Sequence, residues 1–175
     1  MAAFDVAKAV AVVFCAAIAQ VSVFAGIDLL GGTPDVLLLT LVAVALLRGP
    51  VYGAAVGFGA GLVVDTANLA TLGVTSLLLT IAGYWIGRYG ETTGGDRAHA
   101  PYVSVAVATV ILQFGALFLH YMLGDEVSAR VALLDALPAK VALNLLLTLP
   151  VYALVRRALA VAAAPKGATE VRLLG

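Results

Sequence analysis

Long apolar stretches follow one another along this chain, and short polar segments separate them. A helix that crosses roughly 30 Å of hydrocarbon needs about 20 apolar residues, and several of these stretches approach that length. Of the 175 residues, 63% are hydrophobic and only 11% are charged, whereas a soluble domain has about 25% charged residues. Because so little polar material cannot cover a water-facing surface, the sequence predicts an all-α polytopic integral membrane protein.

The same composition excludes several other classes of protein. A formal net charge of zero is wrong for a basic nucleic-acid binder, and a single cysteine cannot form the disulfide framework of a small secreted domain. The high apolar content also excludes a disordered chain.

Charges, prolines and glycines divide the sequence into six predicted transmembrane helices that form a single domain over residues 1–175. The first span is read as retained, not as a cleaved leader. The second is about 18 Å long if it is helical, which is short for a complete span, so it is either a thin span or a partly buried helix. Thr33 is expected to cap that helix, with Pro34 at its first position and Asp35 in its first turn. The predicted spans are about residues 6–25, 34–47, 51–69, 72–89, 101–123 and 138–155, followed by a cytoplasmic tail at 156–175.

The basic residues predict the orientation of the chain, because Lys and Arg concentrate in cytoplasmic segments. With a cytoplasmic N-terminus, only Arg130 and Lys140 of the ten basic residues lie outside. Both termini are therefore predicted to be cytoplasmic. The predicted inner set is Lys8, Arg48, Arg88, Arg97, Arg156, Arg157, Lys166 and Arg172, and the predicted outer acids are Asp28, Asp35, Asp65, Asp125, Glu126 and Asp135.

Glycines recur every four residues on two of the predicted helices. Gly53, Gly57 and Gly61 share one helix face, and Gly83 and Gly87 repeat the spacing in the next span. Small residues at this spacing let two helix backbones approach closely in lipid. The two helices are expected either to pack on each other or to receive a helix of a partner. A phosphate-binding loop is disfavoured because no Lys-Ser/Thr pair follows the glycines.

Asp65 is the most informative ionisable residue, since it lies roughly 22 Å beyond the turn at Pro50, where a lone carboxylate in hydrocarbon is costly. We predict that Asp65 forms a structural ion pair with Lys140, and Asn144 lies one helical turn deeper on the same face as Lys140. The functional alternative is that Asp65 belongs to a proton or substrate site. Polar residues within the other spans are expected to form interhelical hydrogen bonds. They are Gln20, Thr80, Thr109, Gln113 and Thr148.

Nothing in the sequence predicts catalysis, a cofactor or a metal. His99 and His120 have no other ligand type at helical spacing, and Cys15 lies in an apolar helix without a histidine near it in sequence. The sequence also has no Gly-x-Ser-x-Gly nucleophile elbow. We therefore expect a protein that is not an enzyme.

The order of motifs over residues 34–90 resembles the bacterial rod shape-determining protein MreD family. The stretch reads Pro-Asp, an apolar run, Arg-Gly-Pro, a Gly-x-x-x-Gly-Phe motif, Gly-Leu, Asp, Leu-Gly and Gly-Tyr. Likeness over the first and the last two spans is limited to hydropathy and length. The resemblance implies that the residues that carry it are scaffold residues. They include Asp35, Arg48, Gly53, Gly57, Asp65 and Gly83.

The resemblance implies a non-enzymatic component of the elongation machinery in the bacterial inner membrane. Members of the family associate with MreC and act with MreB, RodA and a class B penicillin-binding protein in lateral peptidoglycan synthesis. The fold is expected to resemble the substrate-binding S component of energy-coupling-factor vitamin transporters, which gives the alternative function; Ala3, Ala7 and Ala11 have the spacing of its docking face. We hypothesise that the glycine face of residues 51–69, alone or together with that of residues 72–89, receives a transmembrane helix of MreC.

Overall fold

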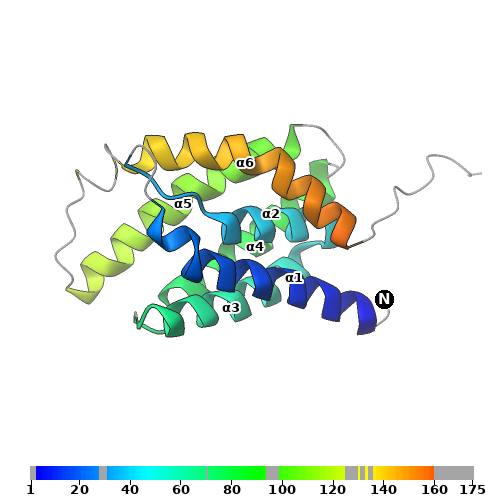
Figure 1. The fold of residues 1–175 in the computed structure, drawn as a ribbon, viewed down its shortest axis with the longest axis horizontal. Coiled ribbons are helices and arrows are strands. Elements are labelled where there is room, and N and C mark those ends of the chain that lie inside the picture. Colours follow the sequence, from blue (N-terminus) through cyan, green and yellow to red (C-terminus); the bar gives the residue numbers. More distant parts are fainter. Residues whose placement is uncertain are drawn as a thin grey trace, which may run out of the picture.

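The computed structural model describes residues 3–27, 31–69, 71–93, 99–124, 130, 133 and 136–159, and the structural statements below concern these residues. They form an all-helical bundle of six α-helices and one short 3-10 helix (Figure 1). The helices are α1 (Ala3–Ser22), α2 (Val36–Arg48), α3 (Pro50–Ala67), α4 (Val74–Thr93), α5 (Ala100–Leu123) and α6 (Leu137–Ala158), with the 3-10 turn at Phe24–Gly26. The predicted tail beyond residue 159 lies outside the described residues.

Helix α2 is the centre of the bundle. It contacts each of the other five helices, and every residue from Leu37 to Leu46 is buried. A helix that is apolar on all sides is stable only when other elements surround it. The question that the short second segment left open is therefore answered: α2 is a buried central helix of 13 residues.

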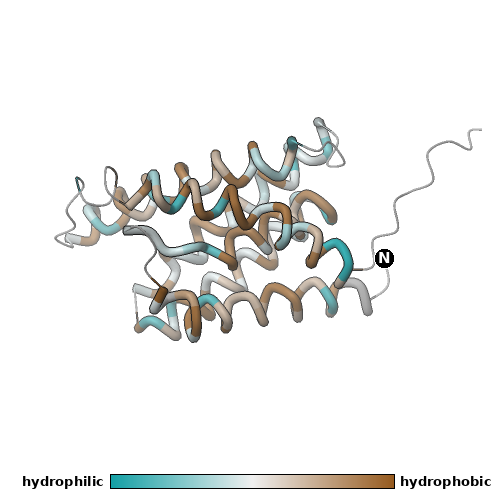
Figure 2. The backbone as a smooth tube through the Cα atoms, turned by 45° about the horizontal axis from the view of Figure 1, so that its top comes forward, coloured by the Kyte–Doolittle hydropathy of each residue, from teal (hydrophilic) through white to brown (hydrophobic). Residues whose placement is uncertain are grey.

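The outer surface of the bundle is apolar, the reverse of a soluble protein. On α5 the exposed side chains follow one helical face, at Val103, Val107, Ile111, Phe114 and Phe118. Figure 2 shows hydrophobic colour along the helices, with hydrophilic segments mainly near their ends. Such a surface matches a hydrocarbon solvent.

Three helices, α3, α5 and α6, are long and apolar enough to cross a membrane. Two shorter apolar stretches, Val6–Ser22 and Val36–Arg48, accompany them. The expectation of six helices is confirmed, whereas six complete spans remain a prediction. Helix α1 begins and α6 ends on the same side of the bundle, the right-hand side in Figure 1, as the prediction of two cytoplasmic termini requires.

The start of α2 differs from the prediction. Asp35, rather than Thr33, is the N-cap residue, because its carboxylate accepts a hydrogen bond from the Leu38 backbone N–H at 2.9 Å. A carboxylate also interacts favourably with the positive end of the helix dipole. The helix therefore begins at Val36, and Pro34 precedes the cap.

Candidate functional site

Helices α3 and α4 meet along a seam of glycines. An added Cβ at Gly57 would lie 2.5 Å from the Leu79 carbonyl oxygen, and one at Gly53 would collide with the backbone of Gly83. Further along α3, Gly61 lies against the backbone of Ser76. Because only hydrogen atoms fit between these backbones, the two helices form one tightly packed hairpin.

This seam decides between the two sequence interpretations of the glycines. The faces of α3 and α4 cover each other, and Gly87 lies against Gly49 and Pro50. The hypothesis that a helix of MreC lies on the glycine face of α3 is wrong, because the α4 backbone already fills that face. Any partner must bind elsewhere.

Asp65, near the end of α3, caps the start of α4. Its side chain is fully buried, and its carboxylate accepts hydrogen bonds from the backbone N–H groups of Gly73 at 2.8 Å, Thr75 at 3.2 Å and Ser76 at 3.5 Å. The first N–H groups of a helix have no partner within the helix, so a buried helix start needs acceptors of this kind. Asp65 supplies them inside an apolar bundle.

The predicted ion pair between Asp65 and Lys140 is therefore wrong. The Lys140 ammonium lies 3.6 Å from the Asp35 carboxylate instead, and about a quarter of each side chain is exposed. The prediction assumed that only a cation could compensate a buried carboxylate, whereas backbone N–H groups at a helix start do so here. The turn a few residues after Asp65 was the sequence signal that Asp65 could instead cap the start of the next helix.

The start of α2 is held by residues from two other helices. On α1, the Gln20 side-chain oxygen accepts from the Val36 N–H at 2.8 Å, and its amide nitrogen donates to the Pro34 carbonyl at 3.1 Å. On α6, the Asn144 side-chain oxygen accepts from the Asp35 N–H at 2.9 Å. The central helix is thereby fixed at one end by its neighbours.

Asn144 extends this network to α5, because its amide nitrogen donates to the Thr109 hydroxyl at 3.0 Å. The expected interhelical hydrogen bonds are confirmed for Gln20, which accepts from Val36 of α2, and for Thr109, which accepts from Asn144 of α6. Thr80 and Thr148 instead donate to carbonyls of their own helices. The sequence placed Asn144 near Lys140 but did not reveal its bridging contacts, since they depend on how α6 packs against α5 and the start of α2.

At the opposite end of α2, the Arg48 guanidinium donates to the Leu159 carbonyl at 3.4 Å. This contact connects the end of the central helix to the residue that follows α6. Arg48 and the network around Asp35 thus hold the two ends of α2.

A recess of about 310 Å³ opens beside the Asp35 end of the bundle, between α1, α2, α3 and α4. A second cavity of about 230 Å³ also has Thr33 in its wall, together with Gln113 and Lys140. We call the first one the polar recess. It is lined by Gln20, Val21, Thr33, Asp35, Leu37, Val64, Asn68, Thr75 and Leu79.

The carboxylates of this region serve as helix caps. Asp35 and Asp65 accept backbone hydrogen bonds, and within the described ranges no three His, Cys, Asp or Glu side chains gather as a metal site would. His120 is partly buried near the end of α5, and His99 is exposed at its start. The arrangement is suited to holding helices in place.

Comparison with known proteins gives one match. The family model described as rod shape-determining protein MreD matches residues 6–158. No curated protein and no solved structure matches the chain, so the likeness to the S-component fold remains a prediction. The family match covers α2 to α6 and all but the first three residues of α1, and the chain belongs to the MreD family of rod shape-determining proteins.

Proposed function

We propose that the protein is a non-enzymatic membrane scaffold that binds MreC and helps direct lateral peptidoglycan synthesis in the bacterial inner membrane. Membership of the MreD family implies a role in rod shape determination. The observation that carries the scaffold proposal is the use of buried polar groups as helix caps and bridges around α2. A rigid bundle of this kind can fix the position of a partner.

The polar recess is the proposed contact for MreC. Asp35 and Asp65 lie at this end of the bundle, whereas Arg48, Arg88 and Arg156 lie towards the other end. Under the positive-inside rule, the recess then faces the periplasm. MreC is a single-span protein with a periplasmic domain, so the segment that leaves the membrane passes at this level.

The lining of the recess supports this assignment. Gln20, Thr33 and Asn68 give the recess polar atoms beside the apolar side chains of Val21 and Leu37. Ligand sites commonly combine an apolar wall with a few polar groups that fix orientation. A membrane-proximal peptide segment offers both apolar side chains and backbone hydrogen-bonding groups. MreB, RodA and a class B penicillin-binding protein are proposed members of the same complex.

Co-purification tests the proposal directly. The protein is expressed with tagged MreC, and the amount retained in mild detergent is compared between variants. Asn68→Trp and Val21→Trp place bulk in the recess and should each reduce retention of this protein severalfold. Val51→Trp is the matched control, since Val51 lies at the opposite end of α3 and is 73% exposed. Equal retention of all three variants would contradict the proposed contact.

A further inference from the structure

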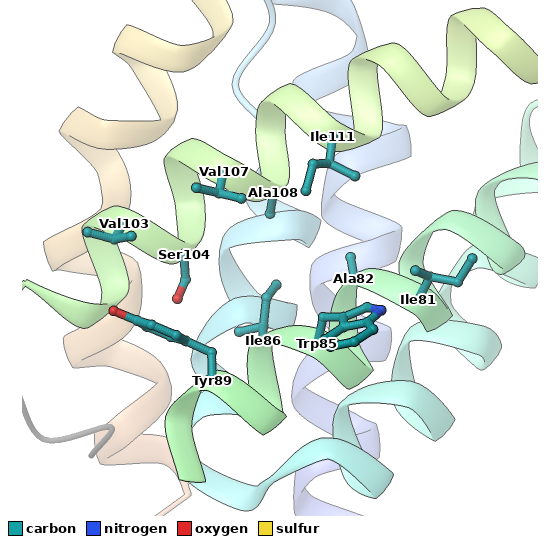
Figure 3. Close-up of a pocket in the computed structure, with 10 residues that line it drawn as sticks. All are labelled: Ile81, Ala82, Trp85, Ile86, Tyr89, Val103, Ser104, Val107, Ala108 and Ile111. Carbon is teal, nitrogen blue, oxygen red and sulfur yellow. The ribbon is translucent and has the colours of Figure 1, made fainter. Parts of the chain in front are cut away.

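A groove on the apolar surface runs between α4 and α5 and encloses about 260 Å³. Its walls are large apolar side chains, and the small residues Ala82, Ser104 and Ala108 lie between them (Figure 3). Other lining residues are Ile81, Trp85, Ile86, Tyr89, Val103, Val107 and Ile111. None of these residues belongs to the polar recess.

The groove has the dimensions of one hydrocarbon chain. A cavity of about 150 Å³ accepts benzene, so the 260 Å³ of this groove has room for roughly ten carbon atoms. The groove extends along α5 from Val103 to Ile111, a length of about 12 Å at the helical rise. An extended chain of ten carbons is also about 12 Å long, given bonds of about 1.5 Å. A helix, about 10 Å in diameter, does not fit within such a space.

A polar atom lies at one end of this apolar groove. Ser104 is 5% exposed, and its hydroxyl has no hydrogen-bond partner among the described residues. In Figure 3 this hydroxyl points into the space between α5 and α4, towards Tyr89 and Ile86. A buried hydroxyl without a partner is unfavourable, so an acceptor near this end would stabilise the site. A plain hydrocarbon chain does not supply one.

The depth and charge of this end indicate what the acceptor is. Ser104 lies one turn after the start of α5 at Ala100, about 6 Å along the helix and near the level where lipid esters lie. The same end of the bundle carries Arg88 on α4 and the pair Arg156 and Arg157 on α6. Basic residues at this level attract anionic head groups.

We propose that the α4–α5 groove binds one acyl chain of an anionic phospholipid. The chain extends along α5 from the level of Ser104 to that of Ile111, and the ester carbonyl at its head accepts a hydrogen bond from the Ser104 hydroxyl. The phosphate lies towards the basic end of the bundle. This site is separate from the polar recess, so lipid binding does not depend on the proposed contact with MreC.

The chain carries its own reporter, because Trp85 is the only tryptophan and lines the groove. Phosphatidylglycerol with brominated acyl chains is titrated into the detergent-solubilised full chain, and bromine quenching of Trp85 fluorescence is followed. We expect saturable quenching at about one lipid per protein. Quenching that rises linearly without saturation would overturn the proposal, since it would report only mixing of lipid with the detergent.

Three variants of groove residues and one control variant locate the lipid. Ala108→Leu fills the floor of the groove and should abolish saturable quenching, whereas Ala55→Leu, at an exposed position of α3, should leave quenching unchanged. Val107→Phe, at the exposed rim, should weaken binding without disturbing the core. Ser104→Ala should raise the half-saturating lipid concentration about fivefold, the value of one net hydrogen bond.

Two outcomes would contradict the assignment. If Ser104→Ala binds the lipid as tightly as the original chain does, no ester is held at Ser104. If brominated lipid leaves Trp85 unquenched and only co-purified MreC changes its fluorescence, the groove accommodates a protein helix instead. The first result would overturn the ester contact at Ser104 and the second would overturn the lipid site itself, and both leave the polar recess to be tested by co-purification.

Discussion

The Asp65 carboxylate accepts a hydrogen bond from the Gly73 backbone N–H at 2.8 Å. This contact joins the last turns of α3 to the residue that precedes α4, across a turn in which Leu69 and Gly73 have positive φ angles of 52° and 99°. The glycine seam continues the same hairpin along both helices. One charged side chain and a row of missing side chains therefore determine how α3 and α4 pack.

Removing the cap should strongly destabilise the bundle. Asp65→Leu leaves three N–H groups without their acceptor, one of them buried and two part-buried, and we expect a loss of about 3 kcal/mol in the free energy of unfolding, since an unpaired buried group costs about 1–3 kcal/mol. Asp65→Asn keeps one carbonyl acceptor and should lose less. Thermal unfolding in detergent, followed by circular dichroism, measures both losses.

A double variant separates this cap from an ion pair. If Asp65 contacts backbone N–H groups and Lys140 contacts Asp35, the losses of Asp65→Leu and Lys140→Leu should add to within about 0.5 kcal/mol. Recovery of stability in the double variant would show instead that the two side chains are partners.

The glycine seam predicts opposite effects for two neighbouring glycines. Gly57→Ala would place its Cβ 2.5 Å from the Leu79 carbonyl oxygen, whereas a Cβ at Gly59 meets nothing within 4 Å. Overpacking costs about 1–3 kcal/mol, while alanine is favoured over glycine in a helix by about 1 kcal/mol. We expect Gly57→Ala to lower the unfolding temperature and Gly59→Ala to leave it unchanged or raise it. Similar melting of the two variants would contradict the close contact.

The bridging role of Asn144 can be compared with that of Thr148, one turn further along α6. Asn144→Leu removes partners of the Asp35 N–H and the Thr109 hydroxyl, with an expected loss of about 2 kcal/mol. Thr148→Val removes only a hydrogen bond to a carbonyl of its own helix and should cost less than about 1 kcal/mol. Chemical unfolding of the two purified variants gives the comparison, and equal losses would count against the bridge.

The predicted orientation can be tested with cysteines in a Cys15→Ser background. His99 and Tyr121 are both accessible, near opposite ends of α5. A membrane-impermeant maleimide added to intact spheroplasts should label Tyr121→Cys and spare His99→Cys. Labelling of His99→Cys alone would mean that the bundle is inserted the other way.

Much of this architecture could be predicted from local patterns. The lengths of the apolar stretches predicted six helices. The four-residue spacing of the glycines that begin at Gly53 and at Gly83 identified the helix faces that meet. The partners of Asp65 could not be predicted in the same way, because its carboxylate contacts backbone atoms that every residue type provides. The position of α2 is a similar case: its length indicated a short helix, but its burial depends on five other helices.

The surface proposed to contact a partner could not be predicted from the sequence either. The glycines marked a close helix contact, and the structure shows that the chain satisfies it internally. The polar recess is built from nine residues on α1, α2, α3, α4 and their connections, and no short motif unites them. Asn68, for example, becomes part of the recess only because α3 ends beside α1 and α4.

The most direct test of the scaffold role is cell shape in a rod-shaped host depleted of this protein. Expression of the original chain or of Val51→Trp should restore rods, whereas Asn68→Trp, inserted at equal levels, should leave the cells round without affecting vitamin uptake. Rods restored equally by Asn68→Trp would contradict the role of the polar recess. Loss of vitamin uptake with normal rod shape on depletion would contradict the scaffold function itself.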